Sequence, residues 1–142
     1  MQGTPSGGSR PLTDRNDRAS ARDLAITAAR AADAKGARDI VVLEVGDVLV
    51  VADEFVIVSA SNDRQVKAIV DDVERVVAEG GHGKPLRVEG LDDRHWVLMD
   101  YGDVVVHVFL DDTRTYYELE RLWRDVPRVD WAEVAASRPT GS

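Results

Sequence analysis

The feature that most constrains the fold is a change in apolar period between residues 54 and 81. Residues 54–60, EFVIVSA, form a short β-branched apolar run that is typical of a buried strand. After the small polar stretch 59–62, apolar residues recur at three- and four-residue spacing, which places them on one helical face: Val66, Ile69, Val70, Val73, Val76 and Val77. Residues 80–81, two glycines, end this repeat, so we predict a strand followed directly by an amphipathic helix.

Helix and strand signals also precede this unit. Residues 20–23, SARD, fit a capping box, in which a hydroxyl and a carboxylate satisfy the first free N–H groups of a helix. The alanine-rich segment that follows reaches a helix stop at residues 35–36, Lys-Gly. Residues 39–45, DIVVLEV, predict a buried strand, and residues 48–51 are a candidate second strand.

Three further segments complete the predicted order of elements. Residues 85–90, PLRVEG, predict a short strand, and residues 94–109, RHWVLMDYGDVVVHVF, predict a hairpin. Residues 115–118, TYYE, resemble a second capping box, which would open a short helix with its apolar side formed by Leu119, Leu122 and Trp123. This order predicts an α/β or α+β domain of three layers, with a mixed β-sheet flanked by helices.

The length of 142 residues suits one domain with unstructured ends. Residues 1–19 are polar and rich in Gly, Ser and Pro, which predicts a disordered N-terminal arm. The domain itself is predicted over residues 20–125. Pro127 closes it, and residues 126–142 are expected to be a C-terminal tail.

Composition restricts the class of partner. The chain has 26 acidic and 18 basic residues, a net charge of −8, and no basic stripe of the kind that nucleic-acid binders use to neutralise phosphates. If the protein works near RNA, we expect it to hold a basic protein. The absence of cysteine excludes disulfides and thiolate metal sites. Without an apolar run of about 20 residues or a signal-peptide core, we expect a cytoplasmic protein.

The hairpin at residues 94–109 allows a more detailed prediction. Because glycine suits a turn position, a two-residue loop at Tyr101-Gly102 is the simplest connection. That loop predicts five cross-strand pairs: Asp100 with Asp103, Met99 with Val104, Leu98 with Val105, Val97 with Val106, and Trp96 with His107. A four-residue loop would preserve these pairs, and a three-residue loop would not.

Alternation along the two strands sorts their side chains onto two faces. The first face is apolar and is predicted to be core: Val97, Met99, Val104, Val106 and Val108. The second face mixes aromatic, apolar and charged side chains: Trp96, Leu98, Asp100, Asp103, Val105, His107 and Phe109. Two interpretations of this second face stay open. Either a helix covers it, or it binds a partner that aromatic residues anchor and carboxylates select by its positive charge.

Catalytic and metal-binding patterns are sparse. Of the histidines, His82 lies in a glycine-rich loop, whereas His95 and His107 fall on opposite faces of the predicted hairpin and would not share a metal. Adjacent aspartates diverge along a strand instead of converging on metal ions, and they occur at 71–72, 92–93 and 111–112. Phosphate-binding glycine motifs are absent. We therefore expect no catalytic residues, no metal and no cofactor.

Four motifs in order resemble the ribosomal silencing factor family, also called iojap-like proteins: FVIVSASNDRQVKAIVDDV (55–73), VEG (88–90), HWVLMDYGDVVVHVF (95–109) and RTYYELERLW (114–123). The resemblance covers roughly residues 20–125. It implies a fold related to nucleotidyltransferases that lacks their catalytic carboxylates.

The resemblance also implies a function. Members of this family bind the large ribosomal subunit at its subunit-joining face, through the basic protein numbered fourteen in bacteria, and sterically block the small subunit. They form homodimers when free. Trp96 matches the family's hairpin tryptophan and is therefore implied to contact the partner, together with the neighbouring candidates Leu98, Asp100, Tyr101, Asp103 and His107.

Two alternatives of other classes stay open at this point. The first is an enzyme that binds or transfers nucleotides on the related fold. The second is a dimeric adaptor that uses the hairpin only for self-association and does not bind the ribosome.

Overall fold

The computed structural model describes residues 11–46, 52–117, 121 and 124–132 of the chain. Within these residues the elements follow in this order: α1 (Pro11–Ala34), β1 (Arg38–Glu44), β2 (Glu54–Ala60), α2 (Asp63–Glu79), β3 (Arg87–Glu89), β4 (Trp96–Asp100), β5 (Val104–Leu110), α3 (Asp111–Tyr117) and β6 (Arg128–Val129). Some predictions lie outside the described residues: the arm at 1–10, the strand at 48–51, and the side chains of Leu119, Leu122 and Trp123.

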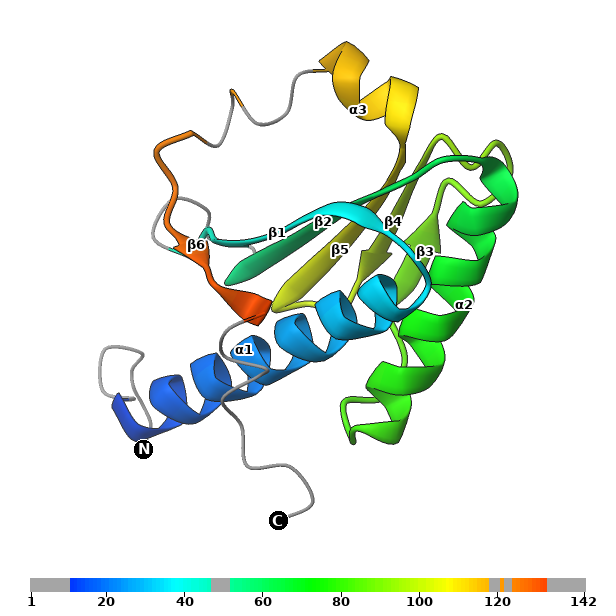
Figure 1. The fold of residues 1–142 in the computed structure, drawn as a ribbon. Coiled ribbons are helices and arrows are strands. Elements are labelled where there is room, and N and C mark those ends of the chain that lie inside the picture. The colour runs from blue at the N-terminus through cyan, green and yellow to red at the C-terminus, as the bar shows by residue number, and fades with distance from the viewer. Residues whose placement is uncertain (1–10, 47–51, 118–120, 122–123, 133–142) are drawn as a thin grey trace.

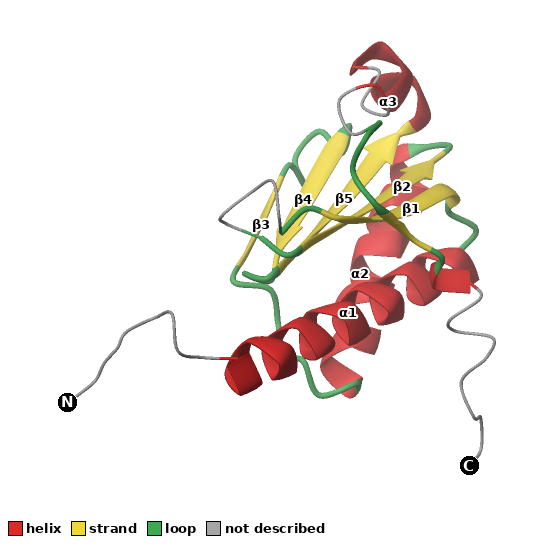
Figure 2. Cartoon of the chain, turned by 90° about the vertical axis from the view of Figure 1, so that its left-hand side faces the viewer, coloured by secondary structure: helices red, strands yellow, loops and turns green. Residues whose placement is uncertain are grey.

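The strands form one mixed sheet in the order β3-β4-β5-β2-β1-β6. β2 and β5 are parallel neighbours, and the other neighbouring pairs are antiparallel. Figure 1 shows α1 and α2 on the same face of this sheet, and Figure 2 shows α3 beyond the ends of the strands. The predicted mixed sheet with flanking helices is confirmed. In the part of the chain that the structure describes, helices cover one face, so the domain has two layers and not the expected three.

Helix α2 forms as its sequence predicts. Asn62 is the N-cap, and its side-chain oxygen accepts the N–H of Gln65 at 2.8 Å, while Gly80 is the C-cap. The residues buried against the sheet are five of the six predicted: Val66, Ile69, Val70, Val73 and Val77. Val76 is only partly buried, at the edge of this face. The apolar stripe therefore fixes how α2 lies on the sheet.

Helix α1 begins earlier than predicted. It starts at Pro11 and not at the capping box of residues 20–23, so residues 11–19 are helical and not part of a disordered arm. Proline suits a first helical turn because it has no N–H to leave unpaired. Small side chains let the helix pack closely on its neighbours, and four of them are fully buried: Ala25, Ala28, Ala29 and Ala32.

The C-terminal elements also differ from the prediction. α3 begins at Asp111, directly after β5, and not at the capping box of residues 115–118. Residues 128–129, predicted as tail, form β6 and pair antiparallel with β1 at the edge of the sheet. The Trp131 indole N–H donates to the Ile40 carbonyl oxygen at 3.3 Å. This part of the predicted tail therefore belongs to the folded domain.

Candidate functional site

The β4–β5 hairpin carries the predicted binding residues, but its register differs from the prediction by two residues. The observed pairs are Trp96 with Phe109, Val97 with Val108, Leu98 with His107, Met99 with Val106, and Asp100 with Val105. The Tyr101 N–H donates to the Val104 carbonyl oxygen at 2.9 Å, so the two loop residues are Gly102 and Asp103. Gly102 has φ of 93°, which the first loop position of a tight hairpin requires.

A shift of two residues leaves every side chain on its predicted face, because side chains alternate with a period of two. The predicted core face is confirmed, since all its members are fully buried: Val97, Met99, Val104, Val106 and Val108. The predicted opposition of Asp100 and Asp103 is wrong. Asp100 pairs with Val105, and its Oδ1 accepts the Gly102 N–H at 2.8 Å, which stabilises the turn.

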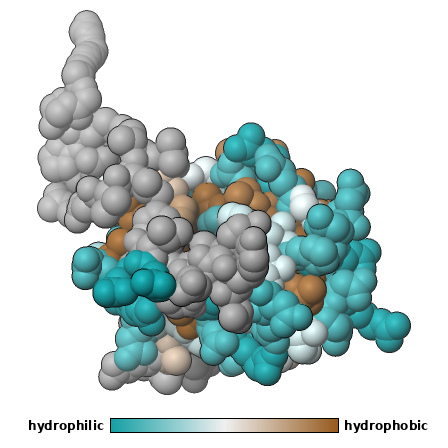
Figure 3. Space-filling view, turned by 90° about the horizontal axis from the view of Figure 1, so that it is seen from above, coloured by the Kyte–Doolittle hydropathy of each residue, from teal (hydrophilic) through white to brown (hydrophobic). Residues whose placement is uncertain are grey.

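On the second face, away from α1 and α2, four rings form what we call the aromatic cluster: Trp96, His107, Phe109 and Phe55. The centroids of Trp96 and Phe109 are 4.8 Å apart, and those of Phe55 and His107 are 4.7 Å apart in an edge-on arrangement. Trp96 is 38% exposed whereas Phe109 is fully buried. Figure 3 shows apolar surface toward the upper middle of this side of the molecule, with hydrophilic side chains to its right.

Phe55 was not among the predicted site residues. It comes from β2, where alternation with the fully buried Val56 and Val58 places it on the second face. The signal was therefore present in residues 54–60, but it becomes informative only once β2 is known to lie beside β5.

The imidazole of His107 is held inside the aromatic cluster. It is 8% exposed, and its Nδ1 accepts the indole N–H of Trp96 at 3.1 Å. Because an indole N–H can only donate, Nδ1 carries no proton and the neutral ring is protonated at Nε2. Burial lowers the pKa of His107 to about 4 from its usual 6.5, so the ring is neutral at pH 7. Nε2 is buried and has no hydrogen-bond partner among the described residues.

The other predicted residues of the second face lie along β4 and at the turn. Leu98 is partly buried and pairs directly with His107. Asp100 Oδ2 lies 3.3 Å from Nε of Arg87 on β3, and Asp103 is exposed at the tip of the hairpin. The structure therefore brings an exposed indole, a half-buried aliphatic side chain and two carboxylates onto one face or its rim.

Tyr101 does not join them. Its side chain packs against the core cluster on the helix-covered side of the sheet, opposite to Trp96. Burial raises the pKa of Tyr101 to about 12, with a further contribution from Glu74 of α2, and its hydroxyl has no hydrogen-bond partner among the described residues. Tyr101 was expected beside Trp96, on the same face or at the turn, and the structure places it at the turn with its side chain on the helix-covered side.

Gly90, in the VEG motif, determines where β4 begins. Its φ is +92°, and a Cβ atom at this position would lie 2.1 Å from the main-chain oxygen of Trp96. Only glycine allows the chain to pass this close to the start of β4. Gly90 of the VEG motif therefore lets the main chain pack directly against the main chain of Trp96.

A second candidate site lies where the parallel strands β2 and β5 end, the usual ligand position in α/β folds. It is a pocket of about 420 Å³ lined by Ser61, Asn62, Asp63, Asp93, His95, Leu110, Asp111 and Asp112. Among the described residues, no group of three His, Asp or Glu side chains could hold a metal ion. His95 lines this pocket and His107 lies in the aromatic cluster, so the two histidines do not meet.

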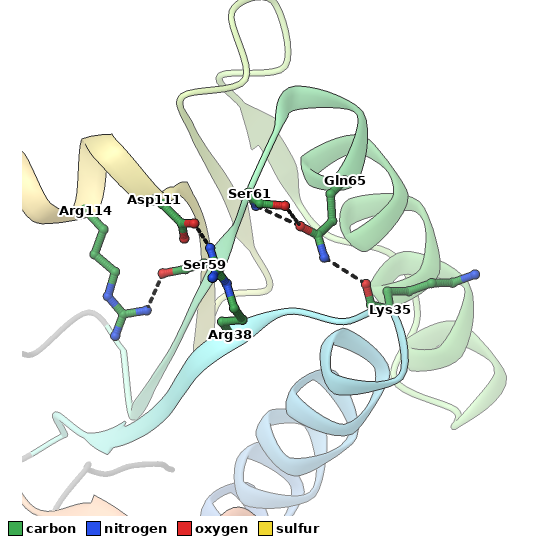
Figure 4. Close-up of polar contacts among 7 residues, drawn as sticks. All are labelled: Lys35, Arg38, Ser59, Ser61, Gln65, Asp111 and Arg114. Atoms are coloured by element: carbon green, nitrogen blue, oxygen red, sulfur yellow. Dashed lines mark hydrogen bonds and ion pairs between the residues drawn. The ribbon is translucent and has the colours of Figure 1, made fainter.

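Polar contacts beside this pocket connect α3 to β2 and to β1, and the α1–β1 turn to α2, as Figure 4 shows. Three of them are Arg114 Nη1 to Ser59 Oγ at 2.7 Å, Arg38 to Asp111, and Gln65 Nε2 to the Lys35 carbonyl oxygen at 3.1 Å. They join neighbouring elements, which is a structural role.

No described helix has the length and apolar character needed to cross a membrane.

Comparison with known proteins gives consistent matches. A family model described as "Ribosomal silencing factor during starvation" matches residues 18–142. A Bacillus subtilis protein named ribosomal silencing factor is 46% identical over 103 residues, which are 72% of this chain and 86% of that protein. A crystal structure of a Chromobacterium violaceum protein is similar with a TM-score of 0.67 at 33% identity, over 71% of this chain and 83% of that chain.

A more distant relative from Mus musculus is named mitochondrial assembly of ribosomal large subunit protein 1. It is 35% identical over 91 residues, which are 63% of this chain and 40% of that protein. The resemblance drawn from the four sequence motifs is confirmed by these matches. Since the family model spans most of the sequence, the chain belongs to the ribosomal silencing factor family.

Proposed function

We propose that this protein binds the large ribosomal subunit through the second face of its sheet and sterically prevents the small subunit from joining. Its relatives are named ribosomal silencing factors, which supports a silencing role at the ribosome. The name of the mouse relative refers to the large subunit. The proposed mechanism is occlusion and requires no catalytic residue.

One observation carries the proposal: Trp96 is 38% exposed at the margin of the aromatic cluster. A large aromatic side chain whose base is packed and whose outer edge is open is the usual anchor of a protein interface. Leu98 lies on the same strand and face, next to the indole in the alternation. A partner that covers Trp96 and Leu98 would bury apolar area that water now contacts.

The charge of the chain supports a protein partner and not direct contact with rRNA. The net charge of −8 would be repelled by phosphates. Asp100 and Asp103 flank the second face and are suited to Lys or Arg side chains. The family resemblance implies the basic protein numbered fourteen in bacteria, and we propose it as the docking partner because the charge of the chain fits a basic protein.

The test is co-sedimentation of Trp96→Ala with isolated large subunits. Removing the anchor is expected to weaken binding about tenfold or more. Leu86→Ala is the matched control, because Leu86 is a 76% exposed apolar residue that precedes β3 and lies against the hairpin turn. Unchanged binding of Trp96→Ala would remove Trp96 from the site. Light scattering during subunit joining then measures occlusion directly, and Trp96→Ala should restore joining.

We also propose that the free chain forms a homodimer. The mass of the wild-type protein and of Trp96→Ala, measured by multi-angle light scattering, separates this from ribosome binding. If Trp96→Ala breaks the dimer but binds large subunits normally, the second face serves self-association alone.

A further inference from the structure

His107 is a polar residue at a position that its surroundings make apolar. Its ring is 8% exposed and lies against Phe55 and Phe109, with centroids 4.7 and 6.2 Å away. Its neighbours across the flanking strands are Ile57 and Leu98. An aliphatic side chain of similar size would fill this place without burying any polar atom.

The two ring nitrogens of His107 differ in their hydrogen bonding. Nδ1 accepts the Trp96 indole N–H at 3.1 Å, whereas Nε2 is buried without a partner in the described part of the chain. An unpaired buried N–H destabilises the folded state relative to an apolar replacement. Among the described residues, the hydrogen bond with Trp96 is therefore the one polar interaction of the His107 side chain that offsets the burial of its imidazole.

We propose that His107 is a positioning residue that holds the Trp96 indole in its docking orientation before the partner binds, and that it does so at a cost in fold stability. This inference rests on the proposed function, because it assigns Trp96 as the anchor. The hydrogen bond to this acceptor favours one orientation of the indole, and ordering a side chain only when the partner binds costs free energy. The acceptor on β5 removes that cost because the ring is ordered in advance.

The test compares two substitutions that affect stability and docking in opposite directions. His107→Leu removes the acceptor and the unpaired N–H, so the protein should melt at the same or a higher temperature, yet bind large subunits about threefold to tenfold more weakly. His107→Asn places an amide oxygen near the position of Nδ1, so it should melt at a lower temperature and bind like the wild type.

A direct readout of the indole accompanies the binding measurement. In a ¹H–¹⁵N spectrum, Trp96→Phe identifies the Trp96 indole resonance. That resonance should keep its hydrogen-bonded position in His107→Asn and move upfield in His107→Leu. A residue that only stabilises the core would not separate these two variants. Val106→Ala is the matched control on the same strand but on the core face, where Val106 is fully buried, and it should lower the melting temperature without moving the resonance or changing binding.

Three results would overturn the inference: unchanged binding of His107→Leu, a fall in both its melting temperature and its binding, or weak binding of His107→Asn equal to that of His107→Leu. The proposed function fails separately, through Trp96→Ala. If Trp96→Ala weakens binding and His107→Leu does not, Trp96 is the anchor without help from His107. If neither substitution weakens binding, the docking face itself is wrong.

Discussion

The charge of a single residue, His107, depends on its place in the aromatic cluster. Burial lowers its pKa to about 4, whereas an unfolded chain would titrate near 6.5. Between these values the unfolded chain binds a proton that the folded chain does not. Stability is therefore greatest above pH 6.5 and is lost as the pH falls toward 4.

We predict that this residue contributes a loss of about 3 kcal/mol in unfolding free energy between pH 7 and pH 4. Urea unfolding at several pH values measures it, with His107→Leu as the comparison. Carboxylates, among them Glu54 with its pKa raised by burial, also contribute to the pH dependence, but they are common to both proteins, so the difference between the two curves isolates His107. Parallel curves would contradict a buried neutral imidazole.

Gly90 gives a second prediction at the scale of one residue. Gly90→Ala puts a Cβ atom where the Trp96 main-chain oxygen lies, 2.1 Å away, and also strains a φ of +92°. Gly81 has a similar φ of +91° with nothing near its Cβ position. We expect Gly81→Ala to cost about 1 kcal/mol and Gly90→Ala at least about twice that, measured by urea unfolding. Equal costs would mean that the close approach to Trp96 is not rigid.

At the scale of elements, α1 is joined to the sheet by a charge contact as well as by its alanines. Arg22 pairs with Glu44 on β1 and with Glu54 on β2, the second at 2.5 Å. The Glu54 side chain is 6% exposed, and burial raises its pKa even though Arg22 opposes the shift. Arg22 therefore compensates a carboxylate that the packing of α1 takes out of water.

We predict that Arg22→Met destabilises the protein by about 2 kcal/mol or more, because Glu54 stays buried without its partner. Adding Glu54→Gln removes the buried charge and should recover much of the loss. Thermal unfolding of the two single variants and the double variant, treated as a cycle, measures the coupling. Additive single effects would show that the pair is not coupled.

The same scale shows what the sequence could predict. The exact bounds of β2 and the buried stripe of α2 follow from residues 54–79, because both patterns depend only on local periodicity. The hairpin faces also follow from alternation, but the register does not. The positive φ falls on Gly102 as the first loop residue, which shifts every pair by two without moving any side chain to the other face.

Elements that depend on distant neighbours could not be predicted in this way. β6 has two residues, too few for a periodic signal, and it exists because β1 offers an unpaired edge. The early start of α1 and the attachment of α3 directly after β5 are likewise set by packing. For the candidate site, alternation identified Trp96 and His107, but only the order of strands places Phe55 beside them.

At the scale of the whole molecule, the two sides of the sheet differ in what covers them. α1 and α2 pack on one side, and in the described residues the other side carries the exposed Trp96 and the two hairpin aspartates. Alternation identified the core side, but it could not decide whether a helix also covers the other side, because that side carries apolar residues as well. The proposed docking face is the side opposite α1 and α2, and the overall acidity of the chain determines how it would approach a partner.

That acidity gives a prediction about salt. With a net charge of −8, attraction to a basic ribosomal protein should weaken as ions screen it. We expect the Kd for large subunits to rise several-fold between about 50 and about 300 mM KCl at constant Mg²⁺, mainly through slower association, as measured by biolayer interferometry. Asp103→Asn should flatten this dependence, because it removes an exposed charge at the hairpin tip. If the chain instead met rRNA directly, salt would relieve repulsion and the Kd would fall.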